Sequence, residues 1–215
     1  MSVSLPNGSL VSLEATQGSA LTVTAATNAN PCVMTSTAHG LSNGDIVKVT
    51  SGWSRLNGKM VRVANVATNT FELEGYDTSS TSTYAAGTGI GSVREVTAFT
   101  QLSQILSSSS NGGEQQFLEY QFLEADGQVR IPTFKSAAGL TFSVADDPSL
   151  AGYILASTAN DDRVARGVKV TLPSGALIFY VAYISLNKTP SLTVNSVMAV
   201  EVTVSMLNEP VRYTS

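Results

Sequence analysis

Apolar and polar residues alternate along most of the chain, as they do in β-strands that bury one face. The cleanest run is 199–206, where Val200, Val202 and Val204 alternate with polar neighbours. Shorter runs of the same kind lie at 21–25, 46–50, 60–64, 140–144 and 168–172. The pattern predicts a mainly β fold made of many short strands.

Only one segment has helical spacing. Residues 146–148 read Asp-Asp-Pro, an acidic start followed by proline where its missing N–H is harmless. Leu150, Tyr153 and Ile154 then share one helical face, which predicts a short flanking helix over about 148–158. Residues 177–184 are apolar on both strand faces, so we expect the second face to be covered by this helix or by another subunit.

The chain divides into three parts that differ in hydrophobic pattern and composition. Residues 1–19 show no clear period and are expected to be an extended N-terminal arm ordered by a partner, or alternatively a frayed terminus. Residues 20–92 hold five or six short strand candidates and predict a small β-module. Residues 93–215 form a second β-rich unit, in which 107–113 is expected to be a flexible loop.

Composition agrees with the β assignment and narrows the function. Ser and Thr together number 51, and only 13% of residues are charged, a mixture typical of strands and polar turns. The net charge is -4 and Lys and Arg form no cluster, so binding of nucleic acid by charge attraction is not expected. Because long apolar runs are lacking, we expect no signal peptide and no membrane partner.

Catalytic chemistry is not expected. His39 is the only histidine and Cys32 the only cysteine. A histidine base needs a positioned nucleophile, and a nucleophilic thiol needs a neighbouring cation. The carboxylates are scattered and match no calcium loop. We therefore predict no enzyme activity, no metal and no cofactor.

The second unit resembles a known family through short motifs that occur in order. The series is EQQF at 114–117, RIPT at 130–133, KSA at 135–137, ADDP at 145–148, LPSG at 172–175, SLNKTP at 185–190, VMAV at 197–200 and PVRY at 210–213. Together these motifs resemble the tail tube protein, or major tail protein, of bacteriophages with long non-contractile tails. The resemblance covers about residues 93–215.

The module is similar to small β-barrel insertions of phage structural proteins. The matching residues are AHGL at 38–41, GD at 44–45, Val47, LNGK at 56–59, and Phe71 with Leu73. The same fold is named after the first catalytic cysteine half-domain of ubiquitin-activating enzymes. The catalytic cysteine of those enzymes has no counterpart here, so the resemblance implies no ubiquitin chemistry.

The tail tube resemblance implies a structural subunit of the virion, assembled in the host cytoplasm. Six copies form a ring, and rings stack into a hollow tube through which double-stranded DNA passes without specific binding. The tape-measure, tail terminator and tail tip proteins are the further partners that it implies. Each copy is expected to be a β-sandwich with one helix. About four strands per copy, roughly 24 in all, leave an opening of about 40 Å.

DNA slides most easily past polar or acidic side chains, which do not hold its phosphates. The candidates for lining the lumen are Glu119, Gln121, Glu201, Thr203 and Ser205. The candidates for contacts between rings are Leu5, Leu10 and Leu13 in the arm, and Ser109, Asn111 and Gly112 in the loop. The module is expected on the tube exterior, because the lumen has no room for six copies of it.

Two other functions stay open. One is a carbohydrate- or receptor-binding module of a phage tail tip or surface protein, with Trp53, Tyr76 and Tyr84 as its aromatic platform. The other is a tail terminator or tip subunit that shares the tube fold. A small hydrolase is disfavoured because no nucleophile–base pair is found.

Overall fold

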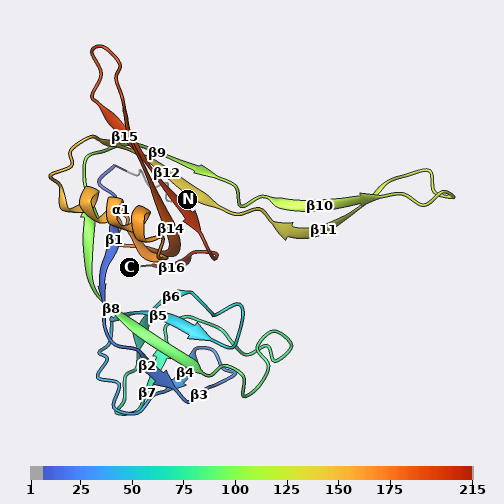
Figure 1. Ribbon diagram of the computed structural model, residues 1–215. Coiled ribbons are helices and arrows are strands. Elements are labelled where there is room, and N and C mark those ends of the chain that lie inside the picture. The colour runs from blue at the N-terminus through green and yellow to red at the C-terminus, as the bar shows by residue number, and fades with distance from the viewer. Residues whose placement is uncertain (1–6, 215) are drawn as a thin grey trace.

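A computed structural model describes residues 7–214 of the chain (Figure 1). These residues form sixteen strands and one α-helix, so the predicted mainly β fold with a single helix is confirmed. Among them, no helix is long and apolar enough to cross a membrane.

The strands fall into three groups. The module contains β2 (Leu21–Val23), β3 (Ala25–Ala26), β4 (Cys32–Thr35), β5 (Ile46–Ser51), β6 (Met60–Ala64) and β7 (Thr70–Leu73). The main unit contains β1 (Leu10–Gln17), β9 (Ile105–Asn111), β12 (Gly139–Ala145), α1 (Ala151–Asp162), β13 (Arg166–Thr171), β14 (Leu177–Ser191), β15 (Ala199–Met206) and β16 (Val211–Tyr213). Strand β8 (Gly91–Leu102) runs through both, and β10 (Gln115–Tyr120) and β11 (Val129–Lys135) form a hairpin arm.

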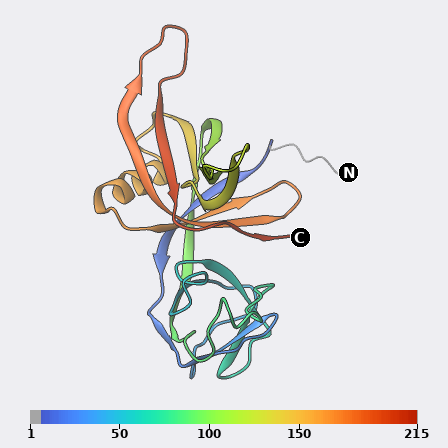
Figure 2. The ribbon, with the colours of Figure 1, turned by 90° about the vertical axis from the view of Figure 1, so that its right-hand side faces the viewer.

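One antiparallel ladder connects the module to the main unit. The order of its strands is β3-β4-β7-β6-β5-β8-β1-β13-β14-β15-β12-β9, with β2 also paired to β8 and β16 to β14. The hairpin arm is a separate two-stranded sheet. It continues from the ends of β9 and β12 and extends far from the body (Figure 1). The loop 192–198 between β14 and β15 is a second projection (Figures 1 and 2).

The first half of β14 is buried on both faces. Phe179 and Val181 join the core of the module, whereas Tyr180 and Ala182 join the core that lies against α1. The sequence predicted a cover of the second face by the helix or by another subunit. The structure places the helix on one face and this chain's own module on the other.

Helix α1 begins and ends slightly later than predicted. Asp147 does not cap it; its Oδ1 instead accepts hydrogen bonds from the backbone N–H (3.1 Å) and the hydroxyl (2.6 Å) of Ser149, in the turn before the helix. The helix lies very close to the sheet at Gly152, where a Cβ atom would collide with the carbonyl oxygen of Gln101. This close approach requires glycine.

Residues 10–17 were predicted to belong to the arm, and this is wrong. They form β1, which pairs with β13 on one side and with β8 on the other. Leu13 is 0% exposed, and the carboxylate of Glu14 is also buried, accepting a hydrogen bond from the N–H of Gly167 (2.6 Å). Val11, Leu13 and Ala15 alternate with Ser12, Glu14 and Thr16, so the two-residue period of this strand is present in the sequence and was overlooked.

The predicted flexible loop 107–113 is also different in the structure. Residues up to Asn111 belong to β9, which pairs along its length with β12. Four consecutive serines give no side-chain alternation, so backbone pairing alone orders this strand. Gly112 and Gly113 follow with positive φ (66° and 80°), where the chain turns into the hairpin arm.

The module is fixed against the main unit by specific polar contacts. Lys48 Nζ donates a hydrogen bond to the carbonyl oxygen of Ala165 (2.7 Å) and lies 3.9 Å from the carboxylate of Glu14. The backbone N–H of Arg62 donates to the hydroxyl of Tyr213 (2.8 Å), and its guanidinium lies 4.6 Å from the centre of the same ring. The two units therefore have a defined relative orientation.

Replacement of Leu13 by Ala is expected to lower the free energy of unfolding by about 3 kcal/mol, because it leaves a cavity in a closed core. The matched control is Leu10→Ala on the same strand, where the side chain is 45% exposed, and it should cost under about 1 kcal/mol. Urea unfolding followed by circular dichroism measures both. Equal effects would mean that β1 is not a central strand.

Burial raises the pKa of Tyr213 to about 12, compared with about 10 in an unfolded chain. The folded state therefore favours the neutral phenol, and its stabilising contribution is complete below pH 10 and is lost as the pH rises through 12. Tyr213→Phe should be less stable than the parent at pH 8 by about 1 kcal/mol, owing to the lost acceptor for Arg62. This difference should shrink above pH 10 and change sign before pH 12, because two pKa units correspond to about 2.7 kcal/mol; a constant difference in unfolding experiments would contradict the assignment.

Candidate assembly surfaces

Strands β14, β15, β12 and β9 share one polar face. Their register aligns three rows of side chains across the four strands. The rows are Tyr183, Ser205, Gly139 and Asn111; Ser185, Thr203, Thr141 and Ser109; and Asn187, Glu201, Ser143 and Ser107. Among these twelve positions there is one carboxylate and no cation, so the surface is polar with a slight negative charge.

The opposite face of the same strands is apolar. Leu186, Val202 and Phe142 are paired in one such row and belong to the core beneath α1. Because side chains alternate between the two faces of a strand, a dry face against the helix places the polar rows on the outside. The structure thus brings Glu201, Thr203 and Ser205 together on one open face of the subunit.

The four-stranded part of the sheet has two edges that the described residues leave largely open. Strand β9 is the last in the order and pairs only with β12. On the other side, the pairing of β13 with β14 ends at Ala182, so residues 183–191 have no strand on that side. One group on this edge is satisfied locally, because the N–H of Leu186 donates to Oδ1 of Asn160 (3.1 Å).

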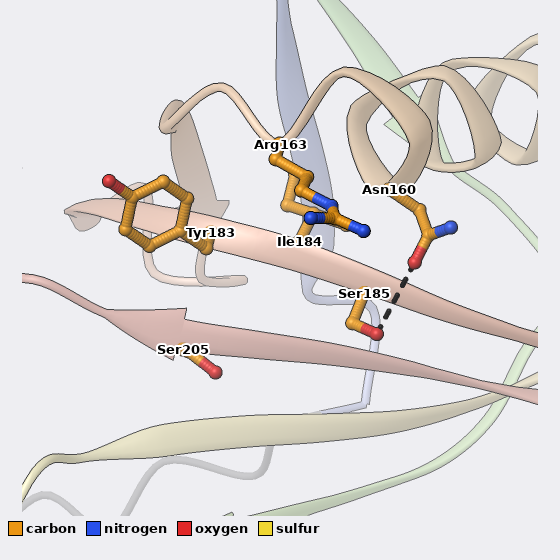
Figure 3. Close-up of a pocket in the computed structure, with 6 residues that line it drawn as sticks. All are labelled: Asn160, Arg163, Tyr183, Ile184, Ser185 and Ser205. Carbon is orange, nitrogen blue, oxygen red and sulfur yellow. Dashed lines mark hydrogen bonds between the residues drawn. The ribbon is translucent and has the colours of Figure 1, made fainter.

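A cavity of about 630 Å³ lies where the end of α1 meets this edge of β14. Figure 3 shows the guanidinium of Arg163 over β14, between Tyr183 and Asn160. The hydroxyl of Ser185 donates a 3.4 Å hydrogen bond to Asn160. The edge therefore presents unpaired backbone next to a cation, which suits an approaching chain with carbonyl or carboxylate oxygens.

The hairpin arm carries an unusual number of exposed apolar side chains. They are 45–104% exposed and comprise Phe117, Leu118, Phe122, Leu123, Val129, Ile131 and Phe134. Contiguous exposed apolar surface of this kind marks an interaction site. The apolar and aromatic residues of 116–123 are a sequence signal for this surface, but nothing in the pattern showed that the strand lacks a core to pack on.

Two of the predicted lumen residues do not lie on the polar face. Glu119 lies on β10, where it forms an ion pair with Arg130 of β11, and Gln121 follows at the end of the strand. The chain leaves the four-stranded sheet at Gly112, where a Cβ atom would collide with the carbonyl oxygen of Ala137. Everything between this bend and the return of the chain belongs to the arm, so these two residues do not share a face with Glu201, and their position in the lumen stays a prediction.

The predicted contacts between rings have different positions in the structure. Leu13 is enclosed in the core, so its assignment as a contact was wrong. Leu10 is exposed, Gly112 lies at the bend, and Leu5 lies outside the described residues. Ser109 and Asn111 lie on the polar face of β9. A role of these four residues, Leu10, Gly112, Ser109 and Asn111, between rings stays a prediction.

Two of the three residues of the candidate aromatic platform are buried. Trp53 is 2% and Tyr84 8% exposed. Their rings pack edge to face at 5.3 Å, and the indole N–H donates to the carbonyl oxygen of Ala85 (2.8 Å). Tyr76 donates its hydroxyl to the carbonyl oxygen of Arg55 (2.9 Å). Trp53 therefore stabilises the module and offers no stacking surface, whereas Tyr76 and Tyr84 also line a cavity together with Arg55 and Lys59.

The residues weighed for chemistry are also structural. His39 is buried, and its two ring nitrogens contact the carbonyl oxygen of Ala67 (2.9 Å) and the N–H of Leu41 (3.1 Å). Burial raises the pKa of the Cys32 thiol, which makes it less reactive. Between residues 7 and 214 no group of three His, Cys, Asp or Glu side chains is arranged to hold a metal ion.

Open sheet edges, one polar face and a projecting apolar arm together define a structural protein that assembles through β-sheet surfaces. The sequence makes this class specific. The family model for the phage tail tube protein, TTP, matches residues 51–215, and the chain belongs to this family. It is a structural subunit of a tail tube.

Several solved structures match with low sequence identity. The virion of a native gene transfer agent particle contains a chain that is 12% identical, with a TM-score of 0.42 over 54% of this chain and 89% of that chain. A chain from the tail of an empty gene transfer agent particle is 12% identical, with a TM-score of 0.43 over 54% of this chain and 87% of that chain. A chain of the anti-feeding prophage cap is 17% identical, with a TM-score of 0.38 over 54% of this chain and 83% of that chain. Among curated proteins, none matches the sequence.

Polar substitution of the arm should separate assembly from folding. Phe117→Ser with Phe134→Ser is expected to change the free energy of unfolding of the monomer by under about 0.5 kcal/mol, because both side chains are solvent-exposed. The concentration needed for assembly, measured by light scattering and electron microscopy, should rise. The control is Ile90→Ser, which removes an equally exposed apolar side chain (52%) from the module. If the control weakens assembly as much as the arm variant, the arm is not the assembly surface.

Proposed function

We propose that six copies of this chain close into a ring by pairing the β9 edge of one subunit with the β14 edge of the next. The observation that carries this proposal is the pair of open edges at opposite sides of one four-stranded sheet. Both edges belong to strands whose polar face and apolar face are already fixed, so edge-to-edge pairing continues both faces into the next copy. Ring closure then satisfies the backbone groups that a single subunit leaves open.

The segment of β14 from 183 to 191 is partly protected before assembly. The side-chain oxygen of Asn160 accepts a hydrogen bond from the N–H of Leu186, and Lys188 forms an ion pair with Asp161 at the end of α1. Such protection of an edge limits uncontrolled pairing of free subunits. A neighbour's β9 would replace the bond to Asn160 by a backbone bond and would lie beside Arg163.

In this arrangement the polar rows face the lumen and α1 lies on the outer side. Six copies of a four-stranded sheet give the roughly 24 strands and the opening of about 40 Å that a duplex about 20 Å wide requires. The rows consist of hydroxyl, amide and carboxylate groups, and one cation, Arg163, shares a cavity with Tyr183, Ser185 and Ser205. A surface with so little positive charge binds DNA phosphates weakly, so that DNA slides through without being retained. The role of Glu201, Thr203 and Ser205 is to form this surface.

Rings stack into a tube through the projecting parts of the subunit. The hairpin arm and the loop 192–198 both carry exposed apolar side chains; Leu192 and Val194 in the loop are 79% and 87% exposed. Burial of these groups between copies provides the favourable free energy of stacking. The module then lies outside the tube, and the tape-measure, terminator and tip proteins meet the inside and the two ends. Such tubes form part of virions assembled in the host cytoplasm.

Gold labelling of assembled tubes tests the orientation of the subunit. Thr203→Cys, on the polar face, should place a maleimide-linked gold cluster on the tube axis in averaged electron micrographs. Thr22→Cys, on β2 of the module, should place it outside the tube. The native Cys32 is buried and serves as the unlabelled background. A Thr203 label on the outer surface, or a chain that remains monomeric at every concentration, would refute the proposal.

A further inference from the structure

A groove lies at the root of the hairpin arm, between the arm, the C-terminal segment and the module. It consists of two adjoining cavities of about 670 and 700 Å³, which share Lys135, Asn208 and Glu209. We refer to the two cavities together as the root groove. Its residues come from three parts of the chain that the fold brings together, and the docking of the module creates one of its sides.

The end of the root groove near the module is basic. Arg55, Lys59 and Lys135 line it together with one carboxylate, Glu209, so three positive charges face one negative charge. Lys135 forms an ion pair with the carboxylate of Glu209. Lys59 Nζ donates a hydrogen bond to the backbone carbonyl oxygen of Glu209 (3.3 Å) and forms no ion pair with its carboxylate. Burial lowers the pKa of Lys59. In a chain with only 12 Lys and Arg, three in one cavity is a marked concentration.

The other end of the root groove is mainly apolar. Ala137, Ala138, Met206, Leu207 and Pro210 line this second cavity. Leu207 is 47% exposed although it follows directly after a core strand. The groove therefore combines an apolar half and a basic half that meet at Lys135 and Glu209.

The tip of the hairpin arm, residues 121–128, has the complementary composition. Phe122 and Leu123 are 59% and 104% exposed. Glu124 and Asp126 follow within three residues, and the tip has no cation. Apolar side chains beside two carboxylates match the apolar half beside the basic half of the root groove.

The tip cannot reach the root groove of its own subunit. Gln115 and Thr133, at the root of the arm, line the groove, and the six residues of β10 carry the tip about 20 Å away from them. The arm is paired along its length, so it cannot fold back. A contact between tip and groove therefore joins two copies in a head-to-tail manner, which is the type of contact that propagates along a polymer.

We propose that the arm tip of one subunit binds in the root groove of a neighbouring subunit, with Phe122 and Leu123 in the apolar half and Glu124 and Asp126 beside Arg55 and Lys59. This inference rests on the proposed tube, since both partners are copies of this chain. It gives the module a function in assembly, because two of the groove's cations belong to the module and reach the groove only when the module is docked.

Carbodiimide coupling of wild-type tubes tests the contact directly, because it joins carboxylates to amines only where they touch. Tubes are assembled from a mixture of ¹⁴N and ¹⁵N protein, so that each tube contains both. They should yield peptides that link Glu124 or Asp126 to Lys59 or Lys135 between chains of different isotope. The ion pair of Lys135 with Glu209 provides an internal control within one chain. Tubes that show the control link but no tip link would overturn this inference while leaving the tube itself established; absence of tubes would refute the proposed function instead.

A charge exchange provides the second test. Glu124→Lys with Asp126→Lys should raise the concentration needed for tube formation about tenfold or more, because like charges then meet in the groove. Arg55→Glu with Lys59→Glu should have a similar effect. All four changes in one chain should restore assembly, which a folding defect would not allow. If the combined variant is no better than either pair alone, the tip does not bind this groove.

Discussion

The whole molecule depends on one continuous ladder of backbone hydrogen bonds, which runs from the module to β9. Strand β14 contributes buried side chains to both hydrophobic cores. Backbone N–H and C=O groups need partners wherever water is excluded, and the ladder supplies them throughout the two cores. Strand β9 and the part of β14 beyond Ala182 still have unused groups, and these two edges are where a single subunit is incomplete.

The sequence predicted most of the strands of this ladder whose side chains alternate, and missed β1 and β9. Val200, Val202 and Val204 identified β15, and the period of two residues correctly placed Glu201 and Thr203 on a common face. Strand β1 was missed although Val11 and Leu13 alternate with Ser12 and Glu14; only the structure shows that Glu14, on the polar face of the strand, is buried as well. Strand β9 was missed because its serines are ordered by the backbone of β12, a contact that leaves no trace in the sequence.

The position of the arm was beyond what the sequence pattern contains. Residues 116–123 have the composition of a core strand, and only the bend at Gly112 shows that they leave the sheet. The same bend separates Glu119 and Gln121 from the polar rows with which they were grouped. An apolar strand without a core of its own is a sign that the protein completes its packing with another molecule, and this requires three-dimensional information to see.

Strands β1 and β8 form a pair whose connection has been replaced by an entire module. Gln17 pairs with Val96, and the N–H of Gly18 donates to the carbonyl oxygen of Glu95 (2.8 Å), so the chain leaves and re-enters the main unit at adjacent points. Such closely spaced ends allow a folded unit to be exchanged without stretching its host. In the proposed tube the outer surface can therefore diversify by exchange of this module without a change in the tube wall, and the same position would display a foreign domain once in every subunit.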